Sequence, residues 1–273
     1  MFAQLPAPTL DDAFALSSHP YIFLIGGGGK TTLMFTLAHH LATAGRTVIS
    51  TTSTKILHPS PADAGSVGVS PADSVIVEAD LERAVSRLRS EFPRARHVTL
   101  AKAPCDADRK LSGYAVDELD YLRQAQVADY VIVEADGAAG RSIKAHEDYE
   151  PVVSRQADLV IAVIGSDCIG CSLDDAHVHR AGRFAQLLNR ALGTPVTVDD
   201  VAAIVFHPLG YLKAVPPEAE LIVLLSKAGG PRRAVAERLA AALHAADRDK
   251  RISRIVIGEL SGPSPFLEPV GSA

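Results

Sequence analysis

A run of four glycines followed by a lysine and two threonines constrains this chain more than any other feature of its sequence. The run consists of Gly26, Gly27, Gly28, Gly29, Lys30, Thr31 and Thr32. It lies between an apolar segment, 21–25, and a segment, 30–44, in which apolar residues recur at helical spacing. This order is typical of a phosphate-binding loop, because glycines let backbone N–H groups approach phosphate oxygens and the helix N-terminus is partly positive. A glycine-rich turn that only caps the helix is the alternative interpretation.

The residues after the glycines predict the chemistry of the loop. Lys30 is expected to bridge the β- and γ-phosphates of ATP or GTP, and the Thr31 hydroxyl is expected to ligate Mg²⁺. The full pattern G-x-x-x-x-G-K-[ST] needs a glycine at position 24, where this chain has Leu24. The shorter pattern G-x-x-G-K-T remains, a form that occurs in ATP-dependent Mur ligases. Ile25 stands where the signature lysine of a MinD-type loop would fall, which disfavours that subclass.

A P-loop enzyme also needs an acidic side chain at the end of a neighbouring strand to hold Mg²⁺. The hexapeptide Val-Ile-Val-Glu-Ala-Asp occurs twice, at 75–80 and 131–136. The first copy runs into a predicted helix, where Asp80 suits an N-cap. The second copy is followed by a glycine, which permits close approach to a ligand. We therefore predict that Glu134 and Asp136 hold Mg²⁺ with the loop threonine, although a simple capped strand end is the alternative.

Hydroxyl groups and a lysine follow the next predicted strand, 47–50. They are Thr51, Thr52, Thr54 and Lys55. In a parallel sheet the end of this strand faces the ligand crevice, so these side chains are candidates for contact with the γ-phosphate, water or Mg²⁺. A solvated Ser/Thr loop explains them equally well.

Elsewhere, short apolar runs alternate with amphipathic segments. Further predicted strands are 75–77, 97–100, 130–133, 159–164, 221–225 and 254–257, and further predicted helices are 81–91, 116–124, 181–192, 198–205 and 232–246. Several strands are apolar throughout, which is typical of a parallel sheet covered by helices on both faces. The predicted fold is a three-layer α/β P-loop NTPase-like domain over 1–273, with an inserted lobe or subdomain at 58–129.

Composition limits the partners that can be expected. The net charge is −5, aromatics make up 5% of the residues and Trp is absent, so we predict no nucleic-acid partner. No apolar run approaches the ~20 residues of a membrane-spanning helix, and no signal peptide is evident. We expect no membrane association and a cytoplasmic location. Cys168 and Cys171 form a C-x-x-C, which is either a redox or metal-binding pair or a pair of small packed residues.

The ordered set of motifs resembles the YqeC family, whose members are described as selenium-dependent hydroxylase accessory or selenium cofactor biosynthesis proteins. Besides the glycine loop and the threonine run, the set comprises Lys110-Leu111-Ser112-Gly113, Glu134-Ala135-Asp136-Gly137, Lys144-Ala145, Glu150-Pro151-Val152 and Val178-His179-Arg180. The resemblance implies a nucleotide-binding protein that helps to mature selenium-dependent molybdenum hydroxylases. Its implied partners are a molybdenum hydroxylase or the proteins that complete its cofactor. Family members usually carry a proline and a histidine where this chain has His146 and Tyr149.

Further candidate residues follow from these motifs. Lys144 is a candidate catalytic or anion-binding residue together with Lys30, Glu134 and Asp136, and His179 and Arg180 are candidates for phosphate binding or proton relay. The late strand ends in Leu225-Ser226-Lys227-Ala228-Gly229, where an Asn-Lys-x-Asp guanine-reading motif would fall. Glycine stands in place of its carboxylate, so the local sequence predicts no strong guanine preference.

Three functions are compatible with these features. The preferred one is a Mg²⁺-dependent NTPase or phosphoryl-transfer enzyme that acts as an accessory protein in hydroxylase maturation. A small-metabolite kinase or Mur-like ligase is the second, and the shortened loop supports it. The third is a nucleotide-gated binding module or metallochaperone that hydrolyses nucleotide slowly.

Overall fold

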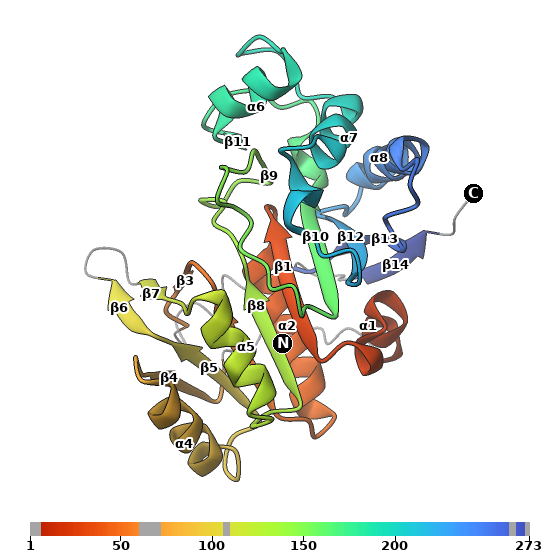
Figure 1. Cartoon of the computed structure of the whole chain (residues 1–273). Coiled ribbons are helices and arrows are strands. Elements are labelled where there is room, and N and C mark those ends of the chain that lie inside the picture. Colours follow the sequence, from red (N-terminus) through yellow and green to blue (C-terminus); the bar gives the residue numbers. More distant parts are fainter. Residues whose placement is uncertain (1–6, 60–71, 106–109, 262–265, 271–273) are drawn as a thin grey trace.

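A nine-stranded sheet forms the centre of the molecule (Figure 1). The computed structural model describes residues 7–59, 72–105, 110–261 and 266–270. In spatial order the sheet runs β14-β13-β12-β10-β1-β8-β2-β5-β4. All neighbouring strands in it are parallel except β13 and β14. Strand β1, which precedes the glycine loop, lies in the middle of the sheet, between β10 and β8.

The elements have the following bounds. The strands of the central sheet are β1 (Tyr21–Gly26), β2 (Val48–Thr52), β4 (Ser74–Val77), β5 (His97–Ala101), β8 (Tyr130–Glu134), β10 (Leu159–Gly165), β12 (Glu220–Ser226), β13 (Arg254–Glu259) and β14 (Phe266–Val270). The α-helices are α1 (Ala7–Phe14), α2 (Lys30–Thr43), α4 (Leu81–Glu91), α5 (Val116–Gln124), α6 (Ala181–Leu188), α7 (Val198–Phe206) and α8 (Arg232–Ala246). Shorter pieces are β3 (Lys55–Leu57), β6 (Ala103–Cys105), β7 (Lys110–Ser112), β9 (Ile143–Lys144), β11 (Val178–His179) and the 3₁₀ turns Leu16–Ser18, Ser166–Cys168 and Tyr211–Ala214.

The central strands are buried on both faces, which explains their uninterrupted apolar runs. Along β1, Phe23 and Ile25 enter one core cluster, while Ile22 and Leu24 enter the other. This alternation follows from the twofold periodicity of a strand. Helix α2 contributes to the second cluster, and α4, α5, α7 and α8 contribute to the first. The predicted mainly parallel α/β class, with helices on both sides of the sheet, is thus confirmed.

Most predicted elements lie within a residue or two of their observed bounds, and the deviations have local causes. Helix α6 ends at Leu188 rather than at 192, because Asn189 adopts a left-handed conformation with φ of 52°. Helix α1 and strand β14 were not predicted. Strand β14 contains Pro269 and lies at the edge of the sheet, where a missing N–H donor is tolerated.

The segment 58–129 contributes to two sheets. Its strands β4 and β5 complete one edge of the central sheet. Strands β6 and β7 form a separate three-stranded antiparallel sheet with β3. Residues 60–71 and 106–109, which belong to the predicted insertion, lie outside the described residues. The boundaries of an inserted lobe stay a prediction. No helix in the described ranges is both long and apolar enough to cross a lipid bilayer.

Candidate functional site

The glycine loop is packed tightly against the strands on one side and is open on the other. Gly26, Gly28 and Gly29 have φ values of 95°, 84° and 123°, which side chains rarely adopt. A Cβ on Gly26 would lie 2.4 Å from the Val163 carbonyl oxygen, whereas a Cβ on Gly29 would meet nothing within 4 Å. The loop therefore requires glycine for its backbone, and its last residue faces open space at the start of α2.

Three of the loop amides bind to the protein itself, which differs from the expectation that the glycine N–H groups converge on phosphate. The N–H of Gly26 donates to Oδ2 of Asp136 at 2.8 Å. The N–H groups of Gly27 and Gly28 donate to backbone carbonyls, each at 2.9 Å. The first turn of a helix has N–H groups without intrahelical partners. The amides suited to an anion are therefore those from Gly29 onward, at the N-terminus of α2.

Two acidic residues at the end of β8, Glu134 within the strand and Asp136 two residues beyond it, meet the first residues of α2. Oγ1 of Thr31 donates to Oε2 of Glu134 at 2.7 Å. Nζ of Lys30 donates to the Gly26 carbonyl at 2.6 Å and lies 3.1 Å from Oδ1 of Asp136 and 3.7 Å from Oε1 of Glu134. The parallel pairing of β8 with β1 causes this meeting, because it brings both carboxyl ends to one edge of the sheet.

The other copy of the hexapeptide has a different setting. Asp80 accepts a hydrogen bond from the N–H of Arg83 and caps α4. Glu78 lies 3.7 Å from the guanidinium of Arg87, at the surface. The two identical segments thus differ in environment, and the second one borders the glycine loop.

Burial and opposite charges shift the pKa values of the three ionisable groups. Burial alone would lower the pKa of Lys30, but Asp136 and Glu134 outweigh it and raise that pKa. Burial raises the pKa of Glu134, partly offset by Lys30. Burial also opposes ionisation of Asp136, but Lys30, His146 and Lys144 hold its pKa well below the usual range. Asp136 is therefore held as an anion beneath the loop, while burial opposes the charge on Glu134.

A buried network extends from Asp136 away from the loop. Nε2 of His146 lies 2.6 Å from Oδ2 of Asp136, and Nζ of Lys144 lies 3.5 Å from the same oxygen. Lys144 also donates to Glu150 at 2.7 Å, and Glu150 accepts two hydrogen bonds from Arg180. Burial lowers the pKa of both His146 and Lys144. These two side chains are 0% exposed.

This network changes the expectation for Lys144 and Arg180. Both were predicted to contact an anionic ligand, yet each pairs with a carboxylate of the protein. In the structure both side chains form ion pairs within the protein. Direct contact with a ligand stays a prediction. His179 is half-buried in β11, which pairs with β9, and burial lowers its pKa.

The threonines after β2 are mostly engaged in local contacts. Oγ1 of Thr52 donates to the Glu134 carbonyl at 2.7 Å and accepts from the N–H of Thr54. Oγ1 of Thr51 is buried without a hydrogen-bond partner in the described structure, and Lys55 is exposed at the start of β3. Thr52 therefore positions the backbone of Glu134, while the expected ligand contacts of these residues stay predictions.

Residues from three other segments border the loop, and the local sequence did not single them out as ligand-binding. Oγ of Ser226 donates to the Gly28 carbonyl at 2.5 Å. Nζ of Lys227 donates to Oγ of Ser142 at 2.7 Å and lies 3.1 Å from Oδ2 of Asp167. The available signal was their position. Ser226 ends β12 and Asp167 comes just after β10, and both strands lie on one side of β1 in the sheet.

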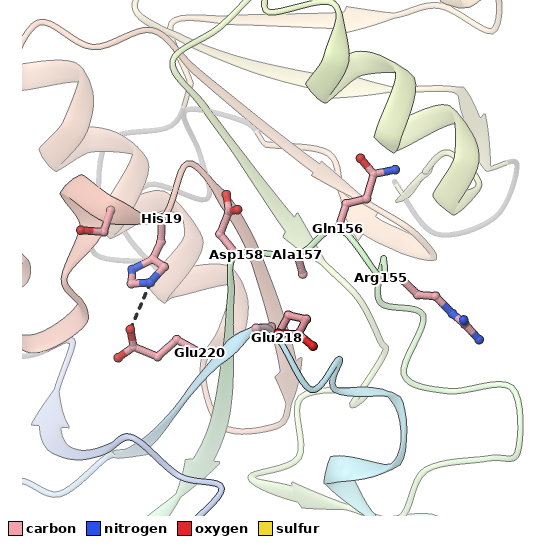
Figure 2. Close-up of a pocket in the computed structure, with 9 residues that line it drawn as sticks. His19, Arg155, Gln156, Ala157, Asp158, Glu218 and Glu220 are labelled. Carbon is pink, nitrogen blue, oxygen red and sulfur yellow. Dashed lines mark ion pairs between the residues drawn. The ribbon is translucent and has the colours of Figure 1, made fainter.

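The cysteine pair and a further pocket lie outside this site. Cys168 is buried, which raises the pKa of its thiol, and no set of three or more His, Cys, Asp or Glu side chains in the described structure is arranged to hold a metal ion. A pocket shown in Figure 2 is lined by Ser18, His19, Arg155, Gln156, Ala157, Asp158, Glu218, Ala219 and Glu220. It lies at the amino ends of β10 and β12, opposite the loop. Its three carboxylates disfavour a phosphate ligand.

The fold and the loop define the class: a mainly parallel α/β protein with a glycine-rich loop between its central strand and a covering helix. Residues 22–182 match the family model described as YqeC protein. The chain belongs to the YqeC family.

One relative is an Escherichia coli (strain K12) protein described as "Uncharacterized protein YqeC", 28% identical over 232 residues that cover 85% of each chain. A solved structure of chloroplast FtsY from Physcomitrella patens aligns over 93% of this chain and 63% of that chain, with 13% identity. Its TM-score of 0.33 is too low to establish a shared fold.

Proposed function

We propose that this protein binds a nucleoside triphosphate with Mg²⁺ at the glycine loop and uses it as an accessory protein in the maturation of selenium-dependent molybdenum hydroxylases. The observation that carries the nucleotide-binding part is the contact between Thr31 and Glu134 beside the open end of the loop. The hydroxylase part rests on the ordered motifs that the chain shares with the YqeC family.

The residues present fit a Mg²⁺ ion. Mg²⁺ prefers oxygen ligands and usually takes one or two carboxylates together with phosphate oxygens and water. Thr31 and Glu134 offer a hydroxyl and a carboxylate at one point, and they would hold the ion. The bound ion would neutralise charge on the phosphates. Because burial disfavours the charge on Glu134, a nearby cation would stabilise its ionised form.

The remaining charged groups suit the positioning of phosphate. Lys30 presents an ammonium at the start of α2, where the helix N-terminus adds partial positive charge. Asp136 fixes both the ammonium and the Gly26 amide, so it holds the loop in place rather than contacting the ligand. Lys30 and Lys144 balance its charge, and His146 makes a hydrogen bond to it.

We expect Glu134→Gln to weaken the Mg²⁺ dependence of nucleotide binding. An amide carries no charge, so the affinity gained on adding Mg²⁺ should fall by roughly tenfold or more, in line with about 1.5–3 kcal/mol for a charged contact. Calorimetric titrations of ATP and GTP, with and without Mg²⁺, measure this. Glu78→Gln is the matched control from the identical segment. If Glu78→Gln has the larger effect, the metal site has been assigned to the wrong copy.

For the biological role, we expect that removing the protein leaves the host's molybdenum hydroxylases synthesised but poorly active. Nucleotide-dependent machinery suits a step that activates a precursor or gates delivery of a labile atom. The measurement is the selenium and molybdenum content of a hydroxylase purified from a deletion strain. Full content with normal activity would refute this role.

One observation favours a second candidate, a small-metabolite kinase or Mur-like ligase. The loop is the shortened G-x-x-G-K-T form, because position 24 is a leucine, Leu24, buried in β1, and not a glycine. This alternative predicts a phosphorylated or conjugated product when metabolites are supplied with nucleotide. A nucleotide-gated binding module instead predicts slow hydrolysis and a nucleotide-dependent complex with a hydroxylase.

A further inference from the structure

The turn after β12 lies directly beside the glycine loop. Ser226, the last residue of β12, donates its hydroxyl to the Gly28 carbonyl at 2.5 Å. Lys227 then reaches Ser142 and Asp167 with its ammonium. Ligands of open α/β sheets bind in the crevice outside the carboxyl ends of the strands. Because β1, β10 and β12 are parallel, this turn lies at the same edge of the sheet as the loop.

A carboxylate from the neighbouring strand stands at this turn. Glu259 is the last residue of β13, which pairs in parallel with β12. The N–H of Gly229 donates to Oε2 of Glu259 at 3.3 Å, and the N–H of Ala228 donates to the Gly258 carbonyl at 3.2 Å. Two strand ends that are about thirty residues apart in sequence therefore form one surface.

Because Gly229 has no side chain, the carboxylate of Glu259 can lie directly against it. A Cβ on Gly229 would lie 3.1 Å from Oε2 of Glu259, a tighter contact than side chains normally make. Gly229 stands where a guanine-reading motif has its carboxylate, and in the fold Gly229 contacts the carboxylate of Glu259. The sequence pattern of β12 alone does not contain this group.

Glu259 makes few polar contacts with the described residues. In the described part of the chain, no lysine, arginine or histidine forms an ion pair with it, and its further contacts are long ones to Ser261, at 3.4 Å. Its side chain is half-buried rather than immersed in solvent. Both carboxylate oxygens retain capacity to accept hydrogen bonds.

We propose that Glu259 reads the base of the bound nucleotide and selects guanine over adenine. Guanine presents two adjacent donors, N1–H and the 2-amino group, which match the two oxygens of a carboxylate. Adenine presents one amino donor beside the N1 acceptor, which a carboxylate repels. This inference rests on the proposed function. It predicts a preference for guanine, whereas Gly229 in place of the motif's carboxylate predicts no strong preference.

The test compares GTP, ATP and XTP by calorimetry on the intact chain, with the variants Glu259→Gln and Glu237→Gln. Glu237 is an exposed glutamate of α8 that pairs with Arg233 and serves as the matched control. We expect the parent to prefer GTP over ATP by at least about tenfold, the range of one well-made bidentate contact. Glu259→Gln should abolish that preference, and Glu237→Gln should retain it.

The affinity for XTP distinguishes a role of Glu259 in base recognition from a loss of structure in the variant. An amide offers one acceptor and one donor, which match the N1–H and the 2-oxo group of xanthine. Glu259→Gln should therefore bind XTP at least about tenfold more tightly than the parent does, a gain that misfolding cannot produce. Equal affinities of the parent for GTP and ATP, or no effect of Glu259→Gln on either ratio, would overturn the inference while leaving nucleotide binding in place. If no nucleotide binds at all, the proposed function itself fails.

Discussion

Lys30→Ala is expected to lower the affinity for a nucleoside triphosphate by roughly ten- to a hundredfold. A hydrogen-bonded charged contact contributes about 1.5–3 kcal/mol, and one decade of affinity corresponds to about 1.36 kcal/mol. Lys30 is the only lysine of the loop, and its ammonium lies at the N-terminus of α2 between the Gly26 carbonyl and Asp136. The measurement is a calorimetric titration with ATP and GTP in the presence of Mg²⁺.

The structure adds a cost that the loop sequence alone does not predict. Lys30 is 4% exposed and faces two buried carboxylates. Its removal leaves Glu134 and Asp136 with less compensating charge, so Lys30→Ala should also lower the free energy of unfolding. The titration is therefore made at a temperature where circular dichroism shows the variant folded. Lys102→Ala, which breaks the ion pair with Glu118, is the control. Unchanged nucleotide affinity in the folded Lys30→Ala variant would contradict the assignment of the loop.

Asp136→Asn is expected to lower the free energy of unfolding by about 3–5 kcal/mol, the usual effect of breaking a buried charge network. Asp136 is 0% exposed and contacts the Gly26 amide, Lys30, Lys144 and His146. Asparagine retains an oxygen for the amide but removes the charge that balances the cations. In a chain of this size, each kcal/mol shifts the melting temperature by a few degrees, so a decrease of roughly 10 °C is expected by calorimetry or circular dichroism.

Asp80→Asn provides a control at the same position of the identical hexapeptide. Asp80 caps α4 through the N–H of Arg83, and asparagine is an equally good N-cap residue. Its melting temperature should remain within about a degree or two of the parent's, since a near-neutral cap exchange changes stability by a few tenths of a kcal/mol. Equal melting temperatures of the two variants would show that Asp136 is not the centre of a stabilising network.

The sheet was predictable because its strands are buried on both faces. Runs such as 159–164 and 221–225 are apolar without alternation, and such runs are typical of central parallel strands. The helix bounds 81–91, 116–124 and 232–246 agree with the observed ones, because apolar periodicity is a local signal. Strand β14 was missed because its pattern is short and interrupted by Pro269, so its pairing with β13 depends on the sheet edge being available.

The candidate site was likewise predictable only in part. The sequence alone determined the glycine loop, its position between a buried strand and a helix, and two candidate acidic segments, because each of these is encoded within a few consecutive residues. The glycine after the second segment already favoured that copy. Only the tertiary structure decided its contact with the loop, the pairing of His146 and Lys144 with Asp136, and the place of Glu259 beside Gly229. Parallel strands join through long crossover connections, so the groups that meet at their carboxyl ends are distant in sequence and carry no local signal of their contact.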